Sequence, residues 1–204
     1  MSEAAAAHHA LEVEPQESPL TPESWGKLGM WVFLAGDAMS FGGLICAYAA
    51  LRIGDPNWPI PSTKLGIPLT AFMTFLLICS SVTMVKGLEA IQRGDRAGLR
   101  KFLLITITCG TAFLGMQAYE WTHLIQGSEH HAALGLGSLF GATFFILTGF
   151  HGCHVFSGVV YLTVILLNAG HYTQSDHNSV EILGLYWHFV DLVWILIFTF
   201  VYLV

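Results

Sequence analysis

Ionisable side chains inside long apolar segments are the residues of this chain most able to do chemistry. Asp37 lies about a dozen residues into the first such segment, with Ser40 three residues further on the same helix face. An ionisable group at bilayer depth costs about 2.5–3.5 kcal/mol on insertion scales, so such groups usually have a role. Asp37 is our candidate for a proton-linked role. The structural alternative is a protonated acid bonded to a neighbouring helix.

Three polar residues follow one another at three-residue spacing in the third apolar segment, namely Gln117, Glu120 and His123. This spacing puts them on one helix face, where they can hydrogen-bond to other helices or bind a metal. A Glu-x-x-His pair resembles half of a carboxylate-bridged di-iron site, which needs a second such pair. The chain has no second pair, so we favour hydrogen bonding.

Histidines in the last two apolar segments leave two interpretations open. His151 and His154 share one face of the fourth segment, and His188 lies in the fifth. Two of them could ligate a haem between helices, as in a membrane cytochrome. The favoured alternative is that they hydrogen-bond to carboxylates on neighbouring helices, with Glu120 and Asp191 as the nearest candidates.

Polar groups facing inward on three helices predict one shared hydrogen-bonded core. In the fifth segment, His188 and Asp191 are three residues apart, and Glu181 lies on the same stripe as His188. We expect a core that stabilises the bundle and binds no metal or cofactor in this chain. Its predicted members are Gln117, Glu120, His123, His151, His154, Glu181, His188 and Asp191.

The segments that must position these residues are long enough to span a bilayer. Of 204 residues, 54% are hydrophobic and 11% charged, against about 25% charged in soluble domains. A spanning helix needs about 20 apolar residues, and a basic footprint for nucleic acid is absent. We predict an all-α membrane protein of five transmembrane helices, at about 25–51, 65–91, 99–125, 136–169 and 180–204.

Charge distribution predicts how the chain is oriented. Residues 1–23 hold five of the fourteen acids and are expected to be a flexible acidic tail before a membrane domain at 24–204. The positive-inside rule then puts the N-terminus in the cytoplasm and the C-terminus outside. Two basic residues, Arg52 and Lys64, lie on the outer side. Six lie on the inner side: Lys27, Lys86, Arg93, Arg96, Arg100 and Lys101.

Two motifs closely resemble subunit III of the haem-copper oxidases. They are Phe144-Phe-Ile-Leu-Thr-Gly-Phe-His-Gly-Cys-His-Val-Phe-Ser-Gly158 and Leu185-Tyr-Trp-His-Phe-Val-Asp-Leu-Val-Trp194. Gln117-Ala-Tyr-Glu-Trp121 and the segment Gly29 to Phe41 are similar to the family's preceding helices. The resemblance covers residues 25–204 and fits the short bacterial form that lacks the first two of seven helices.

This resemblance implies an accessory subunit of a proton-pumping cytochrome c oxidase of aerobic respiration, in a bacterial inner membrane. Such a subunit has no redox centre, packs against subunit I in a complex with subunit II, binds phospholipid, and supports proton uptake and the stability of subunit I. Haem and copper are expected in the partner subunits, and a larger respiratory supercomplex is possible. The family commonly has a Ser-Glu pair where this chain has Gly36-Asp37, and aspartate is one methylene shorter.

Other functions stay open at this point. A quinol oxidase subunit III, or the related accessory protein of nitric oxide reductase, fits the same sequence because electron-donor sites lie on other subunits. A haem-binding electron carrier would use His151, His154 and His188. A small transporter with buried acids lacks the support of an inverted repeat or a broken helix.

Overall fold

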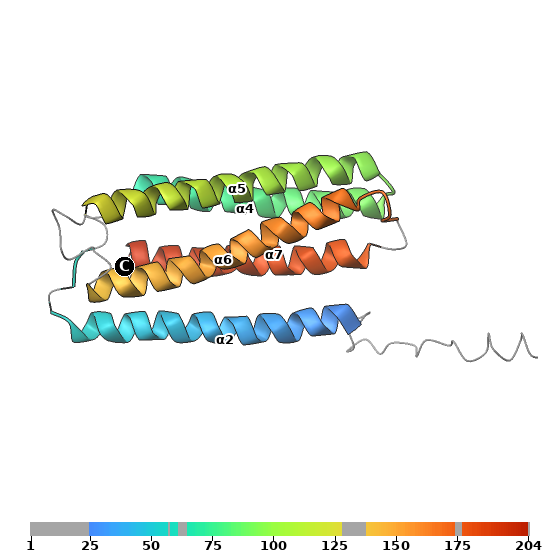
Figure 1. Cartoon of the computed structure of the whole chain (residues 1–204). Helices are drawn as coiled ribbons and strands as arrows, with labels where there is room; N and C mark the ends of the chain where they lie inside the picture. The colour runs from blue at the N-terminus through green and yellow to red at the C-terminus, as the bar shows by residue number, and fades with distance from the viewer. Residues whose placement is uncertain (1–24, 57, 61–64, 128–137, 174–176, 204) are drawn as a thin grey trace, which may run out of the picture.

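Five long helices run alongside one another in the computed structural model of the chain (Figure 1). It describes residues 25–56, 58–60, 65–127, 138–173 and 177–203. Each helix is long and apolar enough to cross a membrane. The helices are α2 (Trp25–Gly54), α4 (Ile67–Gln92), α5 (Arg96–Gly127), α6 (Leu139–Leu167) and α7 (Asn178–Ile197), the last continued by the π-helical turn η2 (Phe198–Leu203).

The prediction of five membrane-spanning helices is confirmed, and their ends differ from the predicted ones by less than one turn. The fourth helix begins later than expected, because the side chain of Ser138 accepts a hydrogen bond from the Gly141 N–H at 2.9 Å and caps it. Pro68 occupies the first turn of α4, where its missing N–H costs no helical hydrogen bond. The tail at 1–23 lies outside the described residues.

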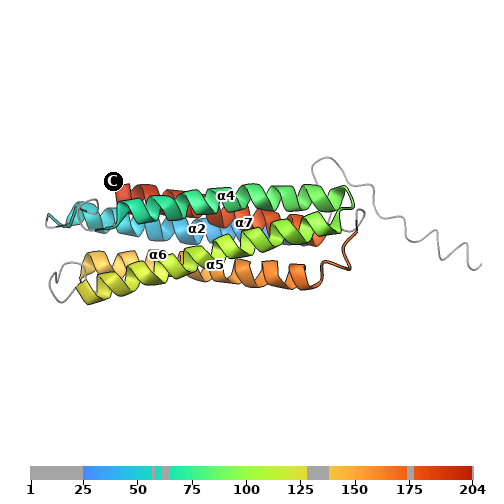
Figure 2. The same ribbon diagram turned by 90° about the horizontal axis from the view of Figure 1, so that it is seen from above.

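The helices are arranged with α4 and α5 together on one side, α6 and α7 next to them, and α2 on the far side (Figures 1 and 2). The contact between α4 and α5 is the most extensive in the bundle, whereas α2 packs mainly against α6 and α7. A tight turn joins α4 to α5 and uses Gly94 at φ +79°, a backbone conformation that side chains disfavour. Asp95 then accepts a hydrogen bond from the Gly98 N–H at 2.9 Å.

Trp187 of α7 is the centre of the packing. It is 1% exposed, and its indole Nε1–H donates to Ser80 Oγ on α4 at 2.9 Å. Glycines make room for the ring on two of the neighbouring helices, α5 and α6. A Cβ added at Gly110 of α5 would lie 2.7 Å from the indole, and one added at Gly158 of α6 would lie 2.9 Å from it. The close approach of α5, α6 and α7 therefore depends on these two glycines.

We expect Gly158→Ala to destabilise the bundle by about 1–3 kcal/mol, the usual cost of overpacking a core. The new methyl group would have to displace Trp187, which has no open side to move into. A denaturant titration of the protein in mild detergent would measure the change. Gly43→Ala is the matched control, because a Cβ at Gly43 meets nothing within 4 Å. Equal stability of the two variants would contradict the prediction.

Candidate functional site

Glu120 of α5 lies in a buried cluster with one residue from α4 and one from η2. Thr70 Oγ1 donates to its Oε1 at 3.2 Å, and Tyr202 Oη donates to its Oε2 at 2.9 Å. All three residues are buried. The carboxyl group therefore joins three segments far apart in sequence, and its partners are hydroxyl groups rather than the histidines of α6.

Asp191 and His188 of α7 meet through Ser81 of α4. Ser81 Oγ lies 2.8 Å from Asp191 Oδ2 and 3.2 Å from His188 Nδ1. Asp191 is 8% exposed, and its second oxygen, Oδ1, is buried without a hydrogen-bond partner among the described residues. The two predicted neighbours are thus connected, although by a serine that lies between them.

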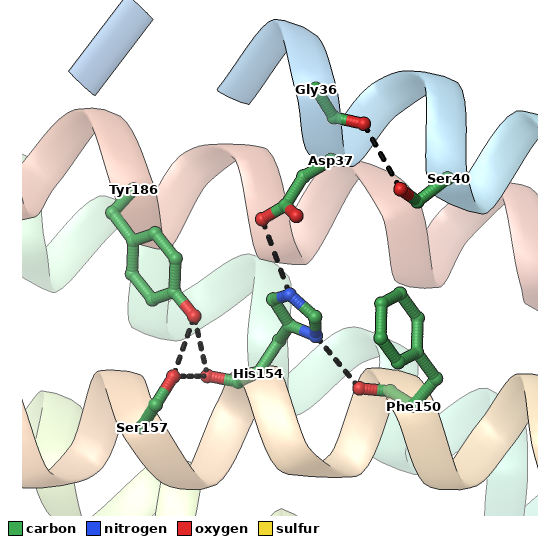
Figure 3. Close-up of polar contacts among 7 residues, drawn as sticks. All are labelled: Gly36, Asp37, Ser40, Phe150, His154, Ser157 and Tyr186. Atoms are coloured by element: carbon green, nitrogen blue, oxygen red, sulfur yellow. Dashed lines mark hydrogen bonds and ion pairs between the residues drawn. The ribbon is translucent and has the colours of Figure 1, made fainter. Parts of the chain in front are cut away.

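Asp37 of α2 pairs with His154 of α6 (Figure 3). Asp37 Oδ2 lies 3.2 Å from His154 Nε2, and the two side chains are 15% and 13% exposed. The opposite ring nitrogen, Nδ1, lies 2.8 Å from the carbonyl oxygen of Phe150. Tyr186 of α7 donates to the carbonyl oxygen of His154 at 3.0 Å and also bonds Ser157 at 2.6 Å. Three helices therefore hold the histidine backbone and ring in place.

The contact between Asp37 and His154 is a hydrogen bond only if a proton lies between the two groups. A carbonyl oxygen only accepts, so His154 Nδ1 must be protonated to bond Phe150. The contact at Nε2 then needs one further proton, either on Asp37 as a neutral acid or on Nε2 as an imidazolium beside a carboxylate. In both forms one proton lies between the two groups. The pair can therefore hold a proton or pass it between α2 and α6.

The remaining candidates have other surroundings. His151 is 0% exposed and lies among the rings of Phe113 and Trp194, with both ring nitrogens lacking hydrogen-bond partners among the described residues.

Gln117 Nε2 donates to the carbonyl oxygen of Thr148 at 2.7 Å and so ties α5 to α6. His123 is exposed beside Tyr119, and Glu181 forms an ion pair with Lys27 of α2 at 2.9 Å.

These residues form separate groups, so the expectation of one shared hydrogen-bonded core is not met. His154 bonds Asp37 rather than Glu120 or Asp191, because the face of α6 that carries His154 packs against α2. His123 lies on the outer surface of α5 although it shares a helical stripe with Glu120. Sequence reasoning also missed the groups that complete the clusters, since hydroxyls in apolar segments are common and carry no distinctive spacing. They are Thr70, Ser81, Ser157, Tyr186 and Tyr202.

Among the described residues, no three side chains of His, Cys, Asp or Glu lie close enough to hold a metal ion. His154 and His188 each bond a residue on a neighbouring helix. The loop histidines His130 and His131 and the tail lie outside the described residues.

Comparison with known proteins gives a consistent match. The family model described as "Cytochrome c oxidase subunit III" matches residues 23–204. The chain is 41% identical over 179 residues to "Cytochrome c oxidase subunit 3" of Synechocystis sp., covering 86% of this chain and 74% of that protein. It is 37% identical to the protein of the same name from Thermostichus vulcanus, covering 86% of each. Identity to the Corynebacterium diphtheriae protein of that name is 37%, covering 87% of each.

The family match and the five spans agree with the positions of the motifs. The described part of the matched range is helical with short connections, and both motifs quoted above lie in α6 and α7. Five spans and bacterial relatives indicate a multi-pass protein of the bacterial plasma membrane. The chain belongs to the cytochrome c oxidase subunit III family.

Proposed function

We propose that this chain is the accessory, non-catalytic subunit III of a proton-pumping haem-copper cytochrome c oxidase in aerobic respiration. The family match over residues 23–204 is the observation that supports it most directly. In this proposal subunits I and II are its partners, and the haem and copper lie in them. The chain stabilises subunit I and supports its proton uptake.

The positions of the histidines favour an accessory role over a haem-binding carrier. A haem held by two histidines needs two ring nitrogens that face one common space. His154 faces Asp37 on α2, His188 faces Ser81 on α4, and His151 lies among the rings of Phe113 and Trp194. The polar groups thus engage neighbouring helices, which is what a structural subunit requires.

Affinity purification of the tagged chain from its native membranes in mild detergent tests this proposal. We expect a haem-copper catalytic subunit among the proteins identified by mass spectrometry. The other co-purified subunits would show whether cytochrome c or quinol is the electron donor. Recovery of the chain alone, with a haem spectrum of its own, would refute the accessory role.

We also propose that Asp37 has the proton-linked role, because it and His154 hold a single proton between them at the edge of the bundle. Replacing Asp37 by asparagine is expected to slow proton uptake by the oxidase or to shorten its turnover lifetime several-fold. The amide can still donate to a neutral imidazole, so the contact survives while the acid is lost. Oxygen consumption, proton pumping and the inactivation rate of the purified complex would measure the effect.

Ser40→Ala is the control for this variant. Ser40 is exposed on α2 one turn beyond Asp37, and its hydroxyl bonds the carbonyl oxygen of Gly36 on its own helix. We expect wild-type activity and lifetime for it. An Asp37→Asn oxidase that matches this control in uptake, pumping and inactivation would reject the proton-linked role while leaving the accessory role intact.

Bound phospholipid is part of the proposed function, and a groove between α5 and α6 supports it. The groove has a volume of about 300 Å³, and Gly149 and Gly152 form part of its wall. Most of its other lining residues are apolar, among them Leu114, Trp121 and Phe156. Such a surface fits an acyl chain. Lipid analysis of the purified complex by mass spectrometry would test for it.

A further inference from the structure

Ser81 of α4 bonds two titratable groups of α7 at once, His188 and Asp191, and their hydrogen bonds can be arranged in two opposite patterns. Its hydroxyl has one proton, so it can donate to one neighbour while it accepts from the other. In one pattern His188 Nδ1–H donates to Ser81, and Ser81 donates to the Asp191 carboxylate. In the other, protonated Asp191 donates to Ser81, and Ser81 donates to His188 Nδ1. The same positions of the heavy atoms satisfy both patterns.

His188 connects this cluster to a groove between α2 and α7. The groove has a volume of about 430 Å³, and His188 forms part of its wall together with Trp31, Leu34 and Phe189. Because Nδ1 faces Ser81, Nε2 on the opposite edge of the half-buried ring is left toward the groove. The other residues that line the groove are largely apolar, so the His188 imidazole is its main polar contact for an entering water molecule.

The groove begins near a charged pair on the same two helices. Lys27 of α2 and Glu181 of α7 form an ion pair at 2.9 Å, and Glu181 is the more exposed, at 33% of its side chain. Glu181 precedes His188 by seven residues, about 10 Å along a helix that rises 1.5 Å per residue. The polar end of the bundle is therefore close to the groove that His188 lines.

Asp191 is suited to receive a proton at the inner end of the cluster. It is 8% exposed, and its Oδ1 is buried with no hydrogen-bond partner among the described residues. An ionised carboxylate with an unpaired oxygen is costly in such surroundings, and protonation removes that charge. Ser81 is the group that the described hydrogen bonds place against both Asp191 and His188, and the other residues that line the groove beside His188 are largely apolar.

We propose that His188, Ser81 and Asp191 form a proton-binding site that exchanges with the groove between α2 and α7. A proton from water in the groove binds His188 Nε2, and the Nδ1 proton passes to Ser81 as the Ser81 proton passes to Asp191. His188 ends neutral with its proton on Nε2, Asp191 ends as a neutral acid, and one proton is gained without any change of redox state. This site is separate from Asp37. Its test in the complex rests on the proposed accessory role, whose own failure would appear as the absence of a haem-copper subunit from the purification.

Infrared spectroscopy of the purified oxidase complex tests the proposal without reference to turnover. We expect a carboxylic acid C=O band that Asp191→Asn removes and that shifts when the complex is transferred to D₂O. Ser81→Ala interrupts the hydrogen-bonded chain but keeps both of its ends. It should slow that shift at least several-fold, because no hydroxyl then remains between His188 and Asp191 to carry the proton. Ser81→Thr keeps the hydroxyl and should restore the wild-type rate.

Ser40→Ala is the matched control, since it removes a hydroxyl from an exposed position on α2. If Ser81→Ala yields no intact complex, His188→Phe makes the same comparison, because it removes the groove-side nitrogen and leaves Ser81 bonded to Asp191. Exchange as fast in Ser81→Ala or His188→Phe as in the control would overturn the proposal. The lack of any carboxylic acid band that Asp191→Asn removes would overturn it too.

Discussion

Replacing Trp187 by alanine is expected to lower the free energy of unfolding by about 3–5 kcal/mol, the range for a fully buried large aromatic. The side chain is 1% exposed and fills the space between Gly110 and Gly158. Its removal leaves a cavity among three helices, and Ser80 loses the Nε1–H that it accepts. Titration of the purified chain from mild to denaturing detergent, followed by circular dichroism, would measure the loss.

Trp25→Ala is the control for that measurement. Trp25 is 89% exposed at the start of α2, so its loss should change stability by less than about 0.5 kcal/mol. A second comparison, Trp187→Phe, keeps most of the ring volume and should fall between the two. A Trp187→Ala protein as stable as the Trp25→Ala protein would show that the indole does not hold the bundle together.

Replacing Glu120 by leucine has the next largest expected effect. The buried hydroxyl of Tyr202 would lose its acceptor, and an unsatisfied buried polar group costs about 1–3 kcal/mol. Thr70 would keep its contact with the carbonyl oxygen of Gly66 at 3.3 Å, so most of the cost falls on Tyr202. The melting temperature of the purified chain in detergent, read by circular dichroism, would report the loss.

Glu120→Gln separates hydrogen bonding from charge in this cluster. The amide oxygen can still accept from Tyr202, and the amide nitrogen can donate to Thr70. We therefore expect stability close to that of the wild type. A glutamine variant as unstable as the leucine variant would mean that the cluster needs an ionised carboxylate rather than hydrogen bonds.

The fold was predictable because a bilayer leaves few choices. About 20 apolar residues make a span, and loop residues such as Pro56, Pro59 and Pro61 mark where the first span must end. The spacing of His188 and Asp191 correctly placed them on one face, and they share Ser81. In a regular helix, the spacing of two residues in the sequence is thus enough to predict whether they lie on the same face.

Partners between helices were not predictable in the same way. Periodicity gives the face on which His154 lies but not which helix that face meets, and its partner is Asp37, 117 residues earlier in the chain. His123 shares the stripe of Glu120 yet is exposed, so spacing along one helix does not tell how far the packed part of its face extends. Serine, threonine and tyrosine hydroxyls complete each cluster. These residues are common in apolar helices, so the sequence does not show which of them form hydrogen bonds between helices.

The packing of α2 has a consequence for the order of biogenesis. Its main contacts are with α6 and α7, which are synthesised last. During synthesis α2 therefore enters the bilayer before either of its packing partners exists, and α4 and α5 pair without it. The partner of Asp37, His154, is inserted only with α6, and both packing partners of α2 are present only once α7 has been synthesised.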